Sequence, residues 1–553
     1  MSTAAAAGAG VHRRRWWILS VLCLSVLLVV VDNTIVNVAL PTMSRRLSAS
    51  TQDLQWIVDA YTLVFAGLLL VGGNLGDRLG RRGVLRAGLV LFALTSVGSA
   101  LSRTTGELIA GRAAMGAAAA LIYPATLALL TSTFTSARER ATAIGVWSAV
   151  SGLAVAIGPV SGGLLLQHFS WSSVFWVNVP VVVIALAAGG RLLPESRDDR
   201  PGRFDPLGAV LSVAGAGLLV WTVIEAPAHG WVSPATLAGL AGSAVILAGF
   251  AYWQVRRPDP MLDVRLFADA RFSAASGAIA LAFFGLFGFI FLITQYFQVV
   301  RGYDPLKAGV ATLPFAVVTG AMSPAAIAAM KRIGTKIVVA GGLACMSAGF
   351  VVAAGIGVQS AYWGKIIASM TLLAAGLALT SGPATDAIMG AVLPGKAGAG
   401  SAVNDTTREL GGTLGVAVVG SVLASVYSTH VLRSLTNLGA PAAAAAAAQK
   451  SVVAGLTTAA HLPPALQSAA AQAARQAFVD GLSAGSLVAA AATAAAAAAA
   501  VIFLPARARQ PRPAGATALV LARTGGPGQA AGDPRRGAGP ATQEISPPGR
   551  AAL

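Results

Sequence analysis

The sequence predicts an all-α membrane protein with about fourteen transmembrane helices. Of its 553 residues, 56% are hydrophobic and only 11% are charged, and the mean hydropathy is +0.72, an apolar excess that no soluble domain of this length needs. The apolar runs are about 18 to 25 residues long, as membrane-crossing helices require, whereas barrel strands would alternate in polarity over about ten residues. In order, the runs begin near Trp16, Gln55, Val84, Leu108, Ala141, Val174, Pro206, Pro234, Phe272, Lys307, Ile337, Tyr362, Val403 and Ser486.

Two short segments suggest that the chain contains two related halves. Arg78-Leu79-Gly80-Arg81-Arg82 follows the second apolar run and Arg332-Ile333-Gly334-Thr335-Lys336 follows the tenth, and both read Arg, apolar, Gly, any residue, basic. Secondary transporters often consist of such repeats. The predicted parts are a cytoplasmic N-terminus at 1–15, a six-helix half at 16–195, two inserted helices at 205–255, a second six-helix half at 271–505 with a long outer loop at 430–485, and a disordered cytoplasmic tail at 506–553.

The net charge of +18 is explained by membrane topology. The basic residues are scattered over the loops instead of clustering with aromatic residues, so we expect a lipid bilayer and no nucleic acid as partner. Arginine and lysine are more frequent in the even-numbered connections than in the odd-numbered ones. By the positive-inside rule, this bias predicts a multi-pass protein of the cytoplasmic membrane with both termini in the cytoplasm.

A Gly- and Arg-rich turn joins the second and third apolar runs. Its glycines allow the chain to reverse within a few residues, Asp77 is placed to meet a helix N-terminus, and its arginines favour the cytoplasmic face. The turn resembles the signature loop of the major facilitator superfamily, which implies two six-helix halves that rock about a central site. The residues that we expect to act in conformational change here are Gly73, Gly76, Asp77, Arg78, Gly80 and Arg81.

The first predicted helix carries an acidic residue deep in an apolar run. At about 100° per residue, Asp32, Asn33 and Asn37 share one polar sector, which should face a cavity. An intramembrane aspartate costs roughly 2.5 to 3.5 kcal/mol on insertion scales and can exchange a proton with either side. We therefore predict proton or substrate coupling at Asp32, with a structural polar contact near the outer boundary as the alternative. The segment resembles the first-helix signature of the fourteen-helix drug/proton antiporter family within the superfamily.

Arg112 lies about one turn inside the fourth predicted span. A charge at this depth needs a partner or water, and Asp32 is a candidate partner. The alternative is an arginine that extends toward the near helix end. The resemblance assigns Arg112 to the family's fourth-helix motif, which is linked to proton transfer.

The fifth predicted span is rich in small residues around a proline. Small residues on adjacent turns predict close helix packing, and the proline predicts a kink. The pattern resembles the antiporter motif of the superfamily's exporters and so favours efflux over uptake. The residues concerned are Gly152, Gly158, Pro159, Gly162 and Gly163.

Further acidic residues stand in three other predicted spans. Asp405, Arg408 and Glu409 have helical i, i+3 and i+4 spacing, so they predict either local salt bridges or a second coupling site at Asp405 and Glu409. Asp59 and Glu225 lie near predicted outer helix ends, where we expect them to be solvated.

Together these features predict a proton-coupled exporter of lipophilic, drug-like or antibiotic-like molecules, with no cofactor. A proton-coupled importer of the same fold and a membrane-embedded enzyme are the alternatives, but the predicted loops offer no catalytic cluster. The sequence contains no Gly-x-x-x-x-Gly-Lys-Ser/Thr loop for ATP. Cys23 and Cys345 lie far apart in different spans, and the histidines lie in predicted loops or termini, so we expect no disulfide and no metal site.

Overall fold

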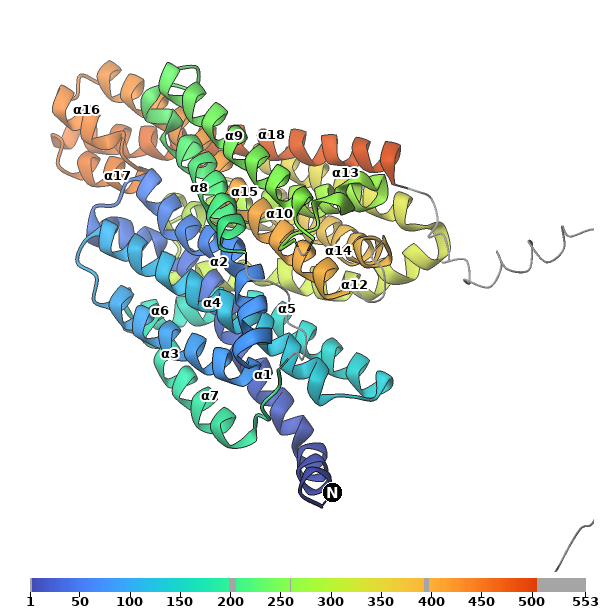
Figure 1. Cartoon of the computed structure of the whole chain (residues 1–553). Helices are drawn as coiled ribbons and strands as arrows, with labels where there is room; N and C mark the ends of the chain where they lie inside the picture. Colours follow the sequence, from blue (N-terminus) through green and yellow to red (C-terminus); the bar gives the residue numbers. More distant parts are fainter. Residues whose placement is uncertain (1, 198–204, 259, 392–396, 505–553) are drawn as a thin grey trace, which may run out of the picture. The chain divides into compact units, whose positions relative to one another are not determined.

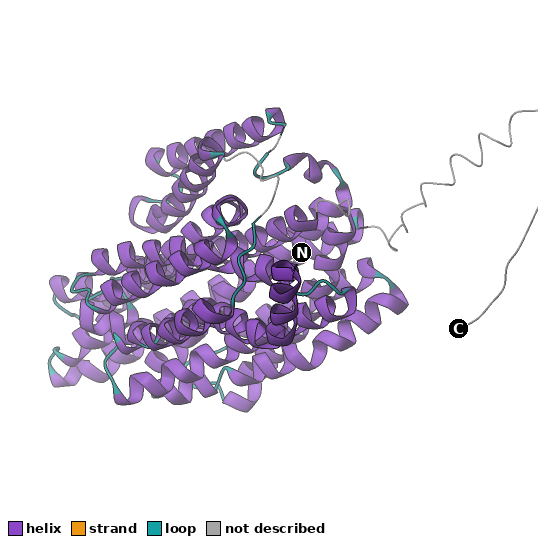
Figure 2. Ribbon diagram, turned by 60° about the horizontal axis from the view of Figure 1, so that its bottom comes forward, coloured by secondary structure: helices purple, strands orange, loops and turns teal. Residues whose placement is uncertain are grey.

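The computed structural model describes residues 2–197, 205–258, 260–391 and 397–504, and every regular element in these ranges is a helix (Figures 1 and 2). Fourteen helical segments are long and apolar enough to cross a membrane, which confirms the predicted all-α membrane fold. Thirteen of them begin within four residues of the predicted positions. The agreement follows from the bilayer thickness, which sets the length of each apolar run.

The first six spans form the N-terminal half, drawn in blue to cyan in Figure 1. A Ser50–Asp53 capping box starts the second span, because each residue bonds a free backbone amide of the other. The helices of this half are α1 (Ser2–Leu47), α2 (Thr51–Leu79), α3 (Arg81–Ala100), α4 (Thr105–Thr133), α5 (Ala137–His168), and α6 (Ser173–Trp176) with α7 (Asn178–Leu192), which share the sixth span.

Two helices follow that have no counterpart in the other half: α8 (Pro206–His229) and α9 (Pro234–Arg256). The C-terminal half then contributes six further spans. Its elements are η1 (Val264–Ala268), α10 (Ala270–Gln295), η2 (Tyr296–Val300), α11 (Pro305–Val310), α12 (Leu313–Ile333), α13 (Thr335–Ala354), η3 (Tyr362–Ile366), α14 (Ile367–Ala391), α15 (Ala397–Asn437), α16 (Ala442–Ala448), α17 (Val452–Ala460) and α18 (Pro464–Phe503).

The two repeated segments form the same turn in the two halves. Gly80 is the single residue between α2 and α3, with φ at +103°, and Gly334 is the single residue between α12 and α13, with φ at +90°. A residue with a side chain rarely adopts these angles, so glycine is needed at both turns. The five-residue sequence match therefore has a structural counterpart.

The last span differs from the prediction. We expected it to begin near Ser486, after a loop at 430–485, but α15 continues to Asn437 and α18 begins at Pro464. Alanine is the strongest helix former. The Ala-rich segment therefore forms helix from Pro464 onward, although its first part is not apolar enough to be recognised as a membrane span. The connection between α15 and α18 contains the short helices α16 and α17. Likewise, α1 already begins at Ser2, within the predicted N-terminal extension, whereas the predicted tail at 506–553 lies outside the described residues.

The two halves bond each other where α1 passes into α2, which we call the α1–α2 end. Gln55 of α2 donates to the backbone carbonyls of Val416 and Ala417 in α15, at 3.3 and 2.9 Å. Gln298 of η2 donates to the carbonyl of Val38 in α1 at 2.8 Å. The helices of the N-terminal half therefore meet those of the C-terminal half at this end of the bundle.

Candidate functional site

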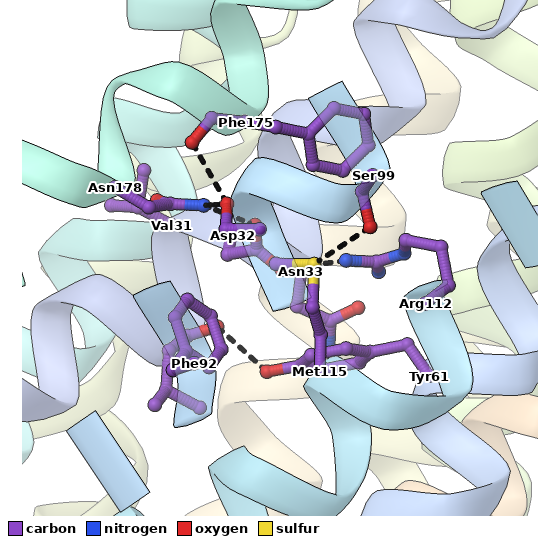
Figure 3. Close-up of polar contacts among 12 residues, drawn as sticks. Val31, Asp32, Asn33, Tyr61, Phe92, Ser99, Arg112, Met115, Phe175 and Asn178 are labelled. Carbon is purple, nitrogen blue, oxygen red and sulfur yellow. Dashed lines mark hydrogen bonds and ion pairs between the residues drawn. The ribbon is translucent and has the colours of Figure 1, made fainter. Parts of the chain in front are cut away.

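Asp32 and Arg112 form an ion pair in the interior of the N-terminal half (Figure 3). Asp32 Oδ2 lies 2.6 Å from Arg112 Nη1, and both side chains are 0% exposed. The extended-arginine alternative is therefore wrong, because Arg112 does not reach the helix end. Asn33 and Asn37 of α1 are buried as well.

Arg112 has two further partners, both in α2. Its Nε donates to the carbonyl of Ile57 at 3.1 Å, and its Cζ lies 4.2 Å from the ring centroid of Tyr61, within the range of a cation–π interaction. Its Nη2 has no hydrogen-bond partner among the described residues. The guanidinium is thus oriented by α1 and α2 together, and one of its donors stays unused.

Sequence reasoning missed the other partner of Asp32. Asn178, the first residue of α7, donates its Nδ2 to Asp32 Oδ1 at 2.7 Å and to Ser96 Oγ at 3.0 Å. The Ser96 hydroxyl in turn donates to the carbonyl of Phe175 at 2.8 Å. In the sequence, neither the spacing of Asn178 nor that of Ser96 indicates a contact with Asp32.

An aromatic row within the N-terminal half begins beside this ion pair, at Tyr61. Tyr61 and Phe65 of α2, Tyr123 of α4 and Trp147 of α5 follow one another with ring centroids 6.0, 5.8 and 5.2 Å apart. The Phe65–Tyr123 and Tyr123–Trp147 pairs meet edge to face, an arrangement that stabilises aromatic clusters. An apolar row beside buried charges is typical of sites that bind small organic molecules.

The second acidic group, on α15, lies within electrostatic range of this row. Glu409 interacts electrostatically with Tyr61, and Asp405, Arg408 and Glu409 all do so with Tyr123. Among the described residues, Arg408 makes no salt bridge to Asp405 or Glu409, although its charge acts on both carboxyl groups. Instead, the Arg408 guanidinium lies 4.7 Å from the ring centroid of Phe283 in α10, and Glu409 Oε2 has no hydrogen-bond partner in the described part of the chain.

The glycines of α5 differ in their surroundings. A Cβ atom on Gly158 would collide with Thr34 of α1, and one on Gly162 would lie 2.7 Å from Ile35 Cγ1. Gly163 faces α11 of the other half, whereas Gly152 has open space around it. Of the four glycines in the predicted motif, three therefore permit close helix contacts, two of them with the helix that carries Asp32, and Gly152 does not.

The α2–α3 turn contacts its own half. Asp77 Oδ1 accepts from Arg81 Nη2 at 2.8 Å, so this carboxylate bonds the next helix through a side chain and not through the backbone amides that we expected. Arg81 also donates to Ser196 Oγ at 3.1 Å, and Arg82 donates to the carbonyl of Gly190 at 2.7 Å. The turn is thereby tied to the segment that follows α7. Of the other glycines in this motif, Gly73 lies near Pro124 and Gly76 lies near Arg81.

The prediction that Asp59 is solvated is wrong. Asp59 is 0% exposed, and neither of its carboxyl oxygens has a hydrogen-bond partner among the described residues. It stands one turn from both Gln55 and Thr62, and both of these bond α15, so it shares the face of α2 that meets the C-terminal half. Glu225, in contrast, keeps 30% of its side chain exposed.

The possible metal ligands among the described residues are the side chains of His, Cys, Asp and Glu. Across the described ranges, no group of three or more His, Cys, Asp or Glu side chains that could hold a metal ion is present. Cys23 and Cys345 are both free cysteines.

Comparison with known proteins identifies relatives along most of the chain. The sequence model of the Major Facilitator Superfamily matches residues 22–416. The chain is 38% identical over 479 residues to the multidrug efflux pump LfrA of Mycolicibacterium smegmatis, which covers 86% of this chain and 94% of the relative. It is 35% identical over 469 residues to the methyl viologen resistance protein SmvA of Salmonella typhimurium, covering 84% and 93%.

A third relative and one solved structure extend this picture. The chain is 35% identical over 419 residues to the tetracenomycin C resistance and export protein of Streptomyces glaucescens, covering 75% of this chain and 77% of the relative. The crystal structure of a bacterial homolog of the human lysosomal transporter Spinster superposes with a TM-score of 0.61 at 19% identity, over 90% of this chain and 99% of that one. At this identity, the likeness concerns the fold alone.

Proposed function

The chain belongs to the major facilitator superfamily, and from this premise we propose that it is a proton-coupled exporter of drug-like or antibiotic-like molecules across the cytoplasmic membrane. It is a multi-pass membrane transporter and not an enzyme. Relatives named as efflux, resistance and export proteins support the outward direction. They count against the importer, as does the glycine pattern of α5.

The observation that carries the proton coupling is the buried ion pair of Asp32 and Arg112. A proton that reaches Asp32 neutralises the carboxylate and leaves the arginine unpaired in a low-dielectric interior, which is unfavourable by several kcal/mol. The N-terminal half must then rearrange or supply another anion. One proton that moves inward across about 100 mV releases roughly 2.3 kcal/mol, enough to drive export without ATP.

The substrate is proposed to bind along the aromatic row between Asp32 and the acidic residues of α15. Ring faces accept many planar or lipophilic molecules, because apolar contact is not directional. Asp405 and Glu409 lie within electrostatic range of the same row and are the second-tier coupling residues of the proposal. The relatives' names cover chemically different compounds, which is consistent with a permissive site.

During transport, the two halves must separate at the α1–α2 end while they close at the opposite end of the bundle. With both termini in the cytoplasm, the α1–α2 end is extracellular, and the structure has the halves joined on that side. Asp77 and Arg81 lie at the opposite end of α2, where their pair stabilises one conformation without touching substrate.

The test uses inside-out membrane vesicles and a fluorescent dye to which expression of the protein confers resistance. An imposed pH gradient should drive dye uptake, and an uncoupler should abolish it. Asp32→Asn should abolish proton-driven uptake in protein that reaches the membrane, whereas Asp32→Glu, which retains a titratable carboxyl, should keep part of it. Undiminished proton-driven uptake by Asp32→Asn would contradict the assignment of Asp32. Uptake that is the same with and without the uncoupler would exclude proton coupling.

A further inference from the structure

A continuous polar chain links five of the six spans of the N-terminal half. It runs from the carbonyl of Phe175 through Ser96 and Asn178 to Asp32, and then through Arg112 to the carbonyl of Ile57. Its members come, in the same order, from α6, α3, α7, α1, α4 and α2, and α6 and α7 share one span. The proposed function uses Asp32 and Arg112 but leaves Asn178 unexplained (Figure 3).

The Ser96 hydroxyl fixes the orientation of the Asn178 amide. A hydroxyl has one proton to donate, and that of Ser96 goes to Phe175. The Ser96 oxygen is therefore left to accept, so Asn178 must face it with its NH₂ group. The same NH₂ group, with its second proton, faces Asp32 Oδ1. Asn178 is 1% exposed, so no solvent competes for these bonds.

Every group that bonds the Asp32 carboxylate is a donor without an acceptor. An amide NH₂ and a guanidinium can only donate, and they occupy Oδ1 and Oδ2 respectively. The charged or titratable groups that face Asp32 are Arg112 from α4 and Tyr61 from α2. The hydroxyl of Tyr61 donates to the carbonyl of Val29 at 3.3 Å, and the elements α3 and α7 contribute only the uncharged Ser96 and Asn178.

Protonation therefore conflicts with this geometry. If Asp32 takes up a proton, one of its two oxygens becomes a hydroxyl. That hydroxyl then points at the donor, Asn178 or Arg112, that bonds the same oxygen. One of the two donors must then move away. Asn178 is the first residue of α7, whereas Arg112 lies inside α4, and a residue at a helix end can shift more readily than one within a helix.

We propose that Asn178 is the positioning residue of the Asp32 carboxylate: it determines the pH at which Asp32 takes up its proton, and its release passes proton binding on to α7. This inference rests on the proposed function, in which Asp32 carries the proton. Asn178 itself neither carries a proton nor touches the substrate.

The experiment is an infrared pH titration of the full-length protein in liposomes, without substrate. The C=O stretch of a protonated carboxyl is assigned to Asp32 by its loss in Asp32→Asn. In Asn178→Leu, the midpoint of this band should move to higher pH by about one to two units, because the ionised form has lost one charge-assisted hydrogen bond. Ser96→Ala, which frees the amide to turn, should give a smaller shift in the same direction.

Matched controls separate positioning from packing. Ser25→Ala removes an equally buried hydroxyl on α1 that bonds only the carbonyl of Val21, and it should leave the midpoint unchanged. Asn178→Ala, which also removes the donor to Asp32, serves in place of Asn178→Leu if the latter does not fold. A midpoint that stays at the wild-type value, or moves to lower pH, in folded Asn178 and Ser96 variants would overturn the proposal.

The titration is independent of transport. If Asp32→Asn still transports with protons, the proposed function loses its coupling residue, whereas the band midpoint still reports whether Asn178 positions Asp32. The two hypotheses therefore fail by different measurements.

Discussion

Gly163 of α5 faces Pro305 of α11 so closely that a Cβ atom on Gly163 would lie 2.5 Å from the proline's carbonyl oxygen. The contact is reciprocal, because a Cβ atom on Gly309 of α11 would collide with the carbonyl of Pro159 in α5. One helix belongs to each half, so two glycines allow the halves to touch at the α1–α2 end. The exporter-like motif of α5 thus acts partly across the interface between the halves, which its sequence alone does not indicate.

Gly163→Ala should impair transport by weakening this contact. The added methyl group meets backbone atoms, which cannot turn aside as a flexible side chain can. We expect dye export to fall at least several-fold in protein that reaches the membrane at the wild-type level. Gly152→Ala, in the same helix but with open space around it, is the matched control and should export normally. Equal export by the two variants would contradict the assigned role of the contact.

Cross-linking the α16–α17 connection to α1 should arrest transport. Ser44 Oγ of α1 lies 3.5 Å from Ser451 Oγ, and the amide of Thr51 donates to the carbonyl of Lys450 at 2.9 Å. These contacts bridge the two halves and must break if the halves separate there. The variant Ser44→Cys/Ser451→Cys, with both native cysteines replaced by serine, should lose export under oxidation and regain it with a reductant.

Each single cysteine variant is a control for this experiment, and its export should be the same with and without the oxidant. The serine oxygens are close enough for the two cysteines to reach one another with little backbone movement. Unchanged export by a fully cross-linked protein would show that the halves do not separate at this end.

Asp59→Leu should stabilise the protein. Leucine has nearly the shape of aspartate, and it removes two buried oxygens that have no partner among the described residues. Relief of an unsatisfied buried polar group is worth about 1–3 kcal/mol. We expect a higher thermal unfolding midpoint in detergent. Glu225→Gln, at a partly exposed position, should leave the midpoint unchanged, and a lower midpoint for Asp59→Leu would reveal a partner that forms in another conformation.

Asp205 anchors the inserted helix pair, and its contribution should depend on pH. Burial raises the pKa of its carboxyl, but hydrogen bonds from Trp253, the Gly208 amide and Gln254, together with the charge of Arg257, outweigh burial and lower the pKa overall. A lowered pKa in the folded state means that the ionised carboxylate contributes stability above its unfolded-state pKa of about 3.9 and loses that stability as the pH falls through the folded-state value.

Asp205→Asn should accordingly destabilise the protein by about 1–3 kcal/mol at neutral pH. The difference in free energy of unfolding between wild type and Asp205→Asn should be constant above about pH 5 and should shrink below about pH 4. Unfolding measured at a series of pH values tests this. Asp304→Asn is the matched control, because Asp304 also caps a helix that starts with proline but is exposed, and asparagine caps equally well. A difference that does not change with pH would show that the charge of Asp205 is irrelevant.

The membrane fold was predictable, and so was the geometry of single turns. Hydropathy predicted the first residue of thirteen of the fourteen spans within a few residues, because whether a segment spans the membrane depends on its own composition. The repeat containing Gly80 and Gly334 indicated equivalent turns, because a single residue with positive φ favours glycine wherever it occurs. The prediction failed at α18, where alanine makes a helix without making a strongly apolar run.

The surroundings of the charged residues were decided by tertiary structure. Sequence alone determined that Asp32 and Arg112 lie inside spans and therefore need partners. It did not determine that Asn178, 146 residues after Asp32, would bond the other carboxylate oxygen, nor that Asp59 would be fully buried. Membrane insertion depends on the local sum of side-chain transfer energies, which a single segment carries, whereas side-chain partnership depends on which helix faces meet, and those faces belong to segments far apart in the chain.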